Sequence, residues 1–317
     1  MTRTIMTVNG PISPESLGYC QCHEHILLRK GTSWEINPAL CMDNPAKSLK
    51  DVTAYAAAGG SSLIDAQPGG CCRMEKELSA ISLASGVNII ASTGFHKLCF
   101  YPYDHWIHSV SQEKMYEFIV HELTSGMFYD IDRFEPVHFS PCRAGIIKCA
   151  FDREEFSPVY TRLFKAAAKA SVFCDVPVMV HMEQGVSAGK LLDFLLNENV
   201  RPERIILCHL DRSILSLNEY SSLLQKGVFL EFDTIGRFKY HDDLSEIKCI
   251  RNLADLGYLN QLLLSLDTTS QRLKSYHPDG IGLDYLFTSF LPGLRHYGFS
   301  DDDIFRLTVT NCKNVFI

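Results

Sequence analysis

The sequence predicts an α/β fold, a (β/α)8 TIM barrel that forms a single domain over residues 1–317. Eight short apolar runs alternate with amphipathic segments along the chain. The runs are almost continuously apolar, as expected for parallel strands covered on both faces, and the composition shows no break. A doubly wound sheet is the alternative, but no G-x-G-x-x-G turn follows the first run.

The predicted strands are too short for helices and are bounded by Gly, Pro or polar turns. They span residues 19–25, 62–66, 88–92, 144–149, 178–181, 205–209, 228–232 and 262–267. Helices are expected at residues 45–58, 73–85, 111–126, 157–174, 188–199, 216–226, 244–258, 283–297 and 301–312. In the first of these, Leu49, Val52 and Ala56 share one face, as a helix packed on a sheet requires.

Two additions to a minimal barrel are expected. An N-terminal β-hairpin within residues 1–18, indicated by Asn9-Gly10, would close the barrel floor. A long loop after strand 3, over residues 94–143, is rich in His, Tyr, Trp and Pro. Connections of this length usually have a packed or functional role, so we expect part of it to cover the active site.

Composition narrows the class of partner. The chain carries 30 Lys+Arg against 37 Asp+Glu, a net charge of −7, with no basic run, which disfavours nucleic acid. It contains no apolar stretch approaching 18 residues and no signal-like N-terminus, which disfavours a membrane partner. The 12 cysteines form no C-x-x-C pairs and predict free thiols in a reducing cytoplasm. We expect a cytoplasmic protein with a small-molecule substrate.

Ionisable residues lie at the ends of five predicted strands. They are His23, His25, Lys148, His181, His209 and Asp267. Catalytic groups of these barrels occupy the C-terminal rim of the strands, so the six side chains should meet at one mouth. Residues two apart in a strand point to one side, which places His23 with His25 and turns Glu24 away. Four imidazoles and a carboxylate exceed what one tetrahedral ion needs, so the pattern predicts a two-metal centre.

Lys148 is an unusual member of this set. An ammonium group in an apolar strand beside two cations would be costly, which favours the neutral amine. A neutral amine can react with CO2 to give a carbamate, whose two oxygens can bridge two metals. We therefore expect a CO2-derived carbamate on Lys148.

The same residues carry a resemblance to a known family. The segments Gly18-Tyr19-Cys20-Gln21-Cys22-His23-Glu24-His25, Ser92-Thr93-Gly94-Phe95-His96, Gly145-Ile146-Ile147-Lys148 and Gly282-Leu283-Asp284-Tyr285-Leu286 resemble the phosphotriesterase family of the amidohydrolase superfamily. The resemblance implies that His23, His25 and Asp267 bind a buried metal and that His181 and His209 bind a more exposed one. Lys148 and a hydroxide would bridge the two divalent ions, which would be zinc, with manganese and cobalt as alternatives. It also implies a homodimer.

The mechanism expected from this centre is hydrolysis. The two metals would provide hydroxide and polarise the substrate, with Lys148 holding the ions and Asp267 transferring a proton. The loops after strands seven and eight carry Arg237, Lys239, Arg272 and Tyr276, where barrels often bind phosphate, and His96 follows strand three. These loops resemble those of a subgroup that hydrolyses phosphorylated sugar lactones.

We therefore expect a lactonase for a phosphorylated or otherwise anionic sugar lactone. A phosphotriester or amide hydrolase with the same metal centre is the alternative, and a non-catalytic barrel that binds sugar phosphate is a third. Glu183 is expected to orient His181. Cys22 and Cys149 are expected to point away from the barrel interior.

Overall fold

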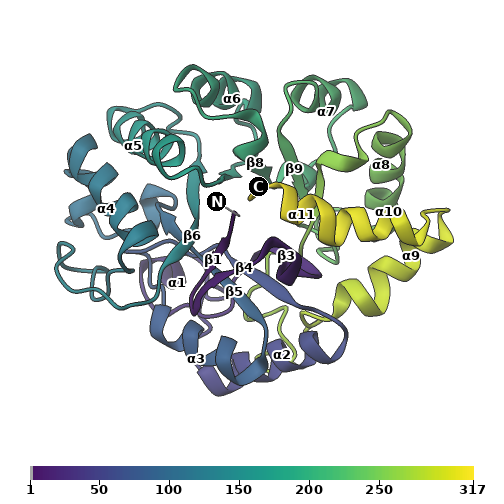
Figure 1. The fold of residues 1–317 in the computed structure, drawn as a ribbon, viewed down its shortest axis with the longest axis horizontal. Helices are drawn as coiled ribbons and strands as arrows, with labels where there is room; N and C mark the ends of the chain where they lie inside the picture. Colours follow the sequence, from purple (N-terminus) through teal and green to yellow (C-terminus); the bar gives the residue numbers. More distant parts are fainter. Residues whose placement is uncertain (1–2) are drawn as a thin grey trace.

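The computed structural model describes residues 3–317 and shows a barrel ringed by helices (Figure 1). Met1 and Thr2 of the predicted domain lie outside the described residues. Within residues 3–317, eight parallel strands form one sheet in chain order. The strands are β3 (Cys20–Glu24), β4 (Ser62–Asp65), β5 (Asn88–Gly94), β6 (Ala144–Phe151), β7 (Val178–Met182), β8 (Ile205–Cys208), β9 (Phe229–Phe232) and β10 (Leu262–Leu264). The predicted barrel is confirmed.

The ring closes where the chain after β10 meets β3. The Asp267 amide donates a hydrogen bond to the His23 carbonyl (3.0 Å), and the Ser265 hydroxyl donates to the same oxygen (2.8 Å). Residues 265–267, which we expected to extend the last strand, form this seam beyond β10, and the Ser265 amide still donates to the Phe232 carbonyl of β9 (2.9 Å). The seam lies beside one of the predicted histidine pairs.

The helices cover the outside of the sheet. They are α1 (Thr32–Ile36), α2 (Pro45–Ala57), α3 (Glu75–Ser85), α4 (Gln112–Thr124), α5 (Pro158–Cys174), α6 (Ala188–Asn197), α7 (Leu217–Leu224), α8 (Asp243–Asp255), α9 (Leu291–His296), α10 (Asp301–Phe305) and α11 (Asn311–Asn314). The two predicted C-terminal helices contain π-helical turns at Leu286–Phe290 and Arg306–Thr310. Pro292 follows the first π turn, and its missing N–H prevents regular α-helical bonding there. Within residues 3–317, none of the helices combines the length and apolar character needed to cross a membrane.

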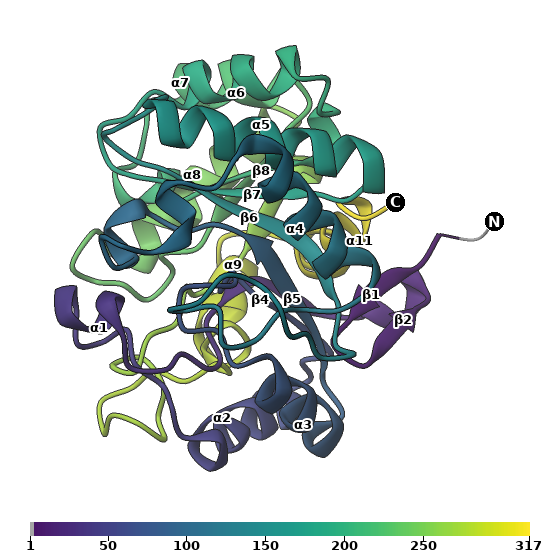
Figure 2. The same ribbon diagram turned by 90° about the vertical axis from the view of Figure 1, so that its left-hand side faces the viewer.

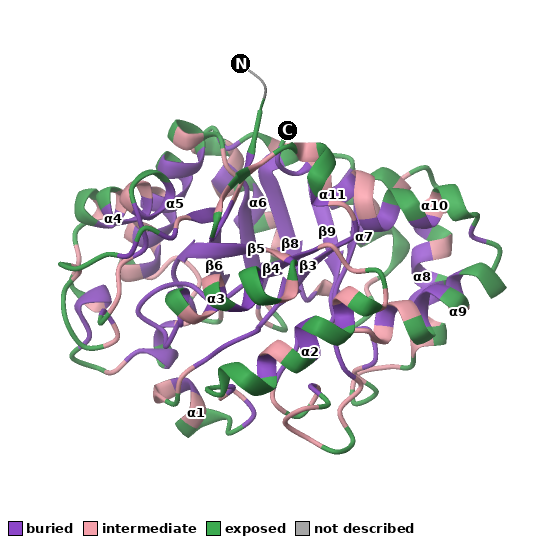
Figure 3. Ribbon diagram, turned by 60° about the horizontal axis from the view of Figure 1, so that its bottom comes forward, coloured by how far each residue is buried: buried purple, intermediate pink, exposed green. Residues whose placement is uncertain are grey.

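The buried strands separate two apolar clusters, and the outer surfaces of the helices are exposed (Figure 3). The inner cluster fills the barrel, with one or two residues from each strand, including Cys20, Ile64, Ile90, Ile146, Met179, Ile206, Phe229 and Leu263. Cys149 belongs to the outer cluster beneath the helices, as expected. The prediction for Cys22 is wrong, because Cys22 packs in the inner cluster. An irregularity in the β3–β4 register between Gln21 and Glu24 interrupts the alternation on which that prediction relied.

The predicted N-terminal hairpin is present and closes one end of the barrel (Figure 2). Strands β1 (Ile5–Thr7) and β2 (Gly10–Ile12) pair antiparallel, with Thr7 opposite Gly10. The two turn residues are therefore Val8 and Asn9, one position before the expected Asn-Gly turn. The Val8 amide donates to the Ile89 carbonyl (2.9 Å), so docking on β5 places the turn. Ile5 joins the inner cluster from below.

The long connection after β5 is a packed unit. It contains α4, short 3₁₀ turns at Leu98–Phe100 and Trp106–His108, and an antiparallel bridge between Phe128 and Phe139. The indole N–H of Trp106 donates to the Ile131 carbonyl (2.9 Å). The connection therefore has its own internal hydrogen bonds, which explains how 50 residues can lie on the barrel without extra strands.

Candidate metal centre

The structure brings the six predicted strand-end residues into one buried cluster. The ring centroids of His23 and His209 are 4.8 Å apart, and those of His181 and His209 are 4.4 Å apart. The His23 and His25 rings are 5.8 Å apart. Each of the six residues is at most 6% exposed. Parallel strands bring their C-terminal ends to one rim, so residues up to 244 positions apart meet there.

Despite the irregularity in β3, residues 23–25 at its end alternate between two sides. His23 and His25 face the site, and Glu24 faces the barrel seam. The Glu24 carboxylate accepts hydrogen bonds from the Ser265 hydroxyl (2.8 Å), the Leu266 amide (2.9 Å) and the hydroxyl and amide of Thr268 (2.7 and 3.2 Å). Glu24 therefore holds the seam closed beside the two histidines.

Lys148 lies at the centre of the cluster and is fully buried. Its Nζ is 3.0 Å from His23 Nε2. The neighbouring strand β5 ends at Gly94, which has a φ of +108°, and a Cβ at Gly94 would collide with the Lys148 carbonyl. Only glycine fits this close approach, so Gly94 allows the end of β5 to pack against the backbone of β6 at Lys148.

Two of the cluster residues have left-handed backbones. His209 has a φ of 64° and Asp267 a φ of 49°, values that non-glycine residues adopt infrequently. Such conformations are strained and persist where surrounding contacts impose them, which happens often at functional sites. His209 comes directly after β8 and Asp267 lies three residues after β10, so both left-handed conformations occur where the chain leaves a barrel strand.

Two buried acids that the sequence analysis missed support the histidines. Glu231 Oε2 lies 3.0 Å from His23 Nδ1, and Asp233 Oδ1 lies 2.6 Å from His209 Nδ1. Burial raises the pKa of Glu231 to about 8 and that of Asp233 well above its usual value, so a nearby cation would favour both ionised forms. A signal was available, because two acids spaced by two residues in an otherwise apolar strand must face the same side.

Burial of the cluster histidines favours their neutral imidazole form. Burial lowers the pKa of His25 to about 4 and that of His181 to about 3. Burial also holds the pKa values of His23 and His209 well below the usual value. Neutral imidazoles have the lone pair that metal ligation needs.

The donor set fits divalent cations that accept nitrogen and oxygen ligands. Ligand atoms of His23, His25 and Asp267 lie within 4.8 Å of one another. Among residues 3–317, His25 Nδ1 and His181 Nε2 are buried with no hydrogen-bond partner. Unpaired buried imidazole nitrogens are costly in a protein interior, and a metal ion would satisfy groups of this kind.

Asp267 lies between the histidines and two arginines. Its Oδ1 is 3.5 Å from His25 Nε2, and its Oδ2 is 2.9 Å from Arg237 Nη2 and 3.3 Å from Arg212 Nη2. Burial opposes ionisation of Asp267, but the positive charges of Arg237 and Arg212 outweigh it and hold the pKa of the carboxyl well below its usual value. Arg212 is a site residue that the sequence analysis did not identify.

The five predicted substrate contacts separate into two groups. Arg237 reaches Asp267, Arg272 donates to the Ile235 carbonyl (2.6 Å) at the same rim, and the His96 ring lies 5.4 Å from that of His181. Burial and the nearby Arg237 lower the pKa of Arg272 to about 10, which reflects crowding of positive charge. Lys239 is exposed with its Nζ over the Tyr240 ring, and the Tyr276 hydroxyl donates to the Asn44 carbonyl (2.8 Å).

Glu183 lies where it was expected, beside His181. Its Oε2 is 3.6 Å from His181 Nε2 and 2.8 Å from Lys97 Nζ. The carboxylate therefore links the histidine to a cation at the edge of the site. This contact is longer than those of Glu231 and Asp233 with their histidines.

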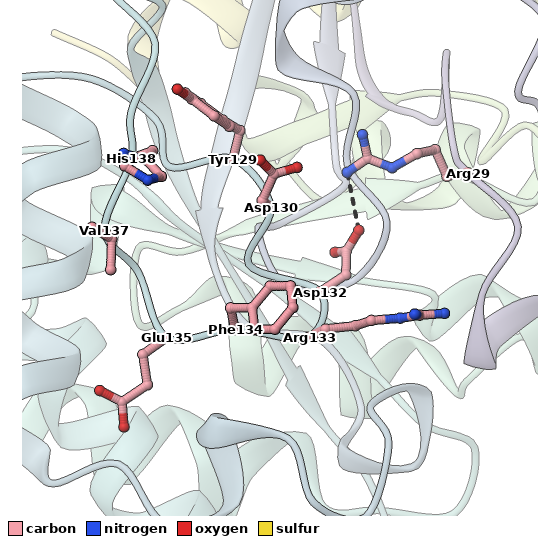
Figure 4. Close-up of a pocket in the computed structure, with 9 residues that line it drawn as sticks. All are labelled: Arg29, Tyr129, Asp130, Asp132, Arg133, Phe134, Glu135, Val137 and His138. Atoms are coloured by element: carbon pink, nitrogen blue, oxygen red, sulfur yellow. Dashed lines mark hydrogen bonds and ion pairs between the residues drawn. The ribbon is translucent and has the colours of Figure 1, made fainter.

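A separate pocket lies on the long connection (Figure 4). It has a volume of about 580 Å³, and its wall includes Arg29, Asp132 and Phe134. The Arg29 guanidinium pairs with Asp132 at 3.0 Å. None of the six cluster residues lines this pocket, so it is distinct from the candidate metal centre.

Comparisons with known proteins agree with this geometry. The model of the phosphotriesterase family matches residues 3–316. A phospho-furanose lactonase of Mycoplasmopsis synoviae (strain 53) is 30% identical over 322 residues, covering 98% of this chain and 90% of the relative. The crystal structure of an amidohydrolase from Mycoplasma synoviae superposes with a TM-score of 0.91 at 29% identity, covering 99% of this chain and 92% of that one. A lactonase from Listeria monocytogenes has a TM-score of 0.89 at 25% identity, covering 99% of both chains. The chain belongs to the phosphotriesterase family of metal-dependent hydrolases.

Proposed function

We propose that this enzyme opens the ring of a sugar lactone that carries a phosphate or a similar anionic group. One observation carries the choice of substrate: the guanidinium of Arg237, whose side chain is 11% exposed, lies 2.9 Å from Asp267 at the rim of the metal centre. An anionic substrate bound there would place its reactive carbonyl near the cluster. The similarity to a phospho-furanose lactonase over 98% of the chain supports the same substrate class.

The proposed centre holds two divalent cations, for which we favour zinc over manganese or cobalt. His23, His25 and Asp267 would hold one ion and His181 and His209 the other, with Lys148 as a carbamate between them. The short separation of the His181 and His209 rings and the grouping of His23, His25 and Asp267 support this division. Glu231 and Asp233 would orient His23 and His209 through their Nδ1 atoms.

Two divalent cations bound there would supply the Lewis acidity that activates water and polarises the lactone carbonyl. The residues of the chain supply the remaining functions. Asp267 would accept the proton of the attacking water and return it to the ring oxygen that leaves. Its Oδ1 faces the histidines and its Oδ2 faces the arginines, so the carboxylate lies between the metal ligands and the anion site.

The proposed anion site contains Arg237 and Arg272, with His96 on the opposite side of the mouth beside His181. Guanidinium groups can hold phosphate through two parallel N–H donors. Lys239 and Tyr276, which we also proposed from the sequence, are engaged with Tyr240 and with the start of α2 in this structure. Their contribution would require the loops after β9 and β10 to rearrange when substrate binds.

A panel of lactones tests this function directly. The zinc-loaded enzyme should hydrolyse a phosphorylated furanose lactone with a kcat/KM at least about tenfold above that of its unphosphorylated form, because a charge-assisted contact contributes about 1.5–3 kcal/mol. Equal rates on the two lactones would reject the anion site. Phosphotriesters and amides in the same panel test the alternative reactions, and the absence of any hydrolysis would favour a barrel that only binds sugar phosphate.

We also propose a single domain, a homodimer and a cytoplasmic location without nucleic-acid or membrane partners. Phe134, Val137 and Phe139 are more than half exposed on the long connection and offer an apolar surface for a second copy. The 12 free cysteines support a reducing compartment. Sedimentation velocity of the purified enzyme tests the dimer.

A further inference from the structure

Arg212 lies beside the candidate metal centre and contacts Asp267. It ends the 3₁₀ turn Leu210–Arg212, which begins directly after His209, and its side chain is only 13% exposed. Its Nη2 lies 3.3 Å from Asp267 Oδ2. We infer that Arg212 is a specificity-determining residue that binds the anionic group of the substrate together with Arg237 and Arg272. This inference rests on the proposed lactonase function.

The geometry of Asp267 defines where the anion would lie. Oδ1 faces His25 Nε2 at 3.5 Å and His23 Nε2 at 3.9 Å. Oδ2 faces Arg237 and Arg212, at 2.9 and 3.3 Å. The carboxylate thus separates the predicted metal ligands from a pair of guanidinium groups. An anion held by that pair is adjacent to the reacting centre without occupying it.

The three arginines have more hydrogen-bond donors than the protein uses. Each guanidinium offers five N–H donors. Arg212 and Arg237 share Asp267, and Arg272 donates to the Ile235 carbonyl. Among residues 3–317, the Nε atoms of Arg212, Arg237 and Arg272 are all buried without a hydrogen-bond partner. Buried unpaired donors on three convergent cations are satisfied by a ligand with several acceptor oxygens, such as a phosphate.

The neighbouring acids do not take up these donors. Asp211 accepts from the Thr234 amide at 2.7 Å, and Asp233 accepts from the His209 amide at 3.0 Å and also contacts the His209 ring. The Arg212 guanidinium lies 5.9 Å over the Tyr240 ring, which holds it without consuming an N–H donor. Arg212 therefore has a fixed position and free donors.

This arrangement distributes the anion site over three loops. Arg212 follows β8, Arg237 follows β9, and Arg272 follows β10. The sequence placed the site on the last two loops only, with Lys239 and Tyr276 as members. In this structure those two side chains contact Tyr240 and Asn44, and Arg212 supplies the additional cation. Contacts from three sides would select the three terminal oxygens of a tetrahedral phosphate over a planar neutral group.

Arg212→Met and Arg212→Lys test the inference in the zinc-loaded enzyme. The measured quantities are kcat/KM for a phosphorylated lactone and for its unphosphorylated form, and the inhibition constant of sulfate. Arg212→Met should lower the ratio of the two kcat/KM values by about 10- to 100-fold and weaken sulfate inhibition by about tenfold or more, as expected for loss of a charged hydrogen bond. Arg212→Lys should retain part of the kcat/KM ratio and part of the sulfate inhibition, because lysine keeps the positive charge and lacks the two parallel N–H donors of a guanidinium group.

Arg295→Met is the matched control, because Arg295 is an exposed arginine paired with Asp301 at 2.9 Å. It should change neither quantity. Metal content, measured by mass spectrometry, verifies that each variant is loaded. An equal loss on both lactones with unaltered sulfate inhibition would overturn the inference and leave Arg212 as a support for Asp267 only. A wild-type enzyme that does not distinguish the two lactones would reject the proposed function, whereas sulfate inhibition would still decide the role of Arg212.

Discussion

Asp233 Oδ1 lies 2.6 Å from Nδ1 of His209, and Asp233 Oδ2 accepts a hydrogen bond from the His209 amide at 3.0 Å. One carboxylate thus holds both the ring and the backbone of a residue with a left-handed φ of 64°. The contact leaves Nε2 of the ring as the available ligand atom. Glu231 contacts only the ring of His23, with its Oε2 3.0 Å from Nδ1, while the His23 amide donates to the Ser265 hydroxyl (2.8 Å).

These carboxylates should set the affinity of the metal centre. We expect Asp233→Asn and Glu231→Gln each to weaken metal binding by about 10- to 100-fold, because the orientation and basicity of the ligand histidines are lost. Competition with a chromophoric chelator measures the dissociation constants. Glu117→Gln, at an exposed position of α4, is the control and should bind metal like the wild type. Unchanged affinity in both site variants would show that the acids serve packing alone.

The carbamate that we propose on Lys148 has a spectroscopic test. Enzyme loaded with zinc in 13C-bicarbonate should show a carbamate carbonyl resonance that is missing from Lys148→Ala. The variant should also retain less than two zinc ions per chain, because the bridging ligand is gone. Lys114→Ala, at an exposed position of α4, should keep the resonance. A wild-type protein with two zinc ions and no such signal would contradict the carbamate.

Metal removal should destabilise the fold as well as abolish activity. The cluster contains buried imidazoles with unpaired nitrogens, so ions bound there would contribute to the free energy of folding. At a free metal concentration of about 1,000 times the dissociation constant, binding contributes about 4 kcal/mol. For a chain of this size the Tm should fall by about 5 °C or more on chelation, measured by calorimetry, and return with zinc. A Tm that does not respond would argue against this metal site.

The long connection depends on a buried ion pair. Arg73 donates to both oxygens of Glu122, at 2.6 and 3.0 Å, and both side chains are fully buried. Arg73→Met should cost about 3–5 kcal/mol, because it leaves an unpaired buried carboxylate. Urea unfolding measures the loss. The double variant Arg73→Met with Glu122→Leu should be more stable than Arg73→Met alone, and the opposite order would reject a role for the charge.

The sequence predicted the barrel and the polar residues that meet at its rim because both depend on local patterns. Apolar runs of four to eight residues reveal strands, and polar residues at their ends mark the rim. His23, His25, Lys148, His181, His209 and Asp267 could be found in this way, and the structure groups them in one cluster. Glu231 and Asp233 could have been found from the same alternation in β9, but their pairing with particular histidines depends on distances between strands.

Other features were decided by the tertiary structure alone. A register irregularity in β3 turned Cys22 into the barrel, and docking of the hairpin on β5 moved its turn by one residue. The direction of a loop side chain cannot be predicted from a periodic pattern. The sequence therefore could not show that Lys239 contacts Tyr240 and that Tyr276 contacts Asn44. Nor could it show that Arg212 reaches Asp267, 55 residues away. Strand periodicity is a local property, whereas the contacts of a rim loop depend on how three turns converge in space.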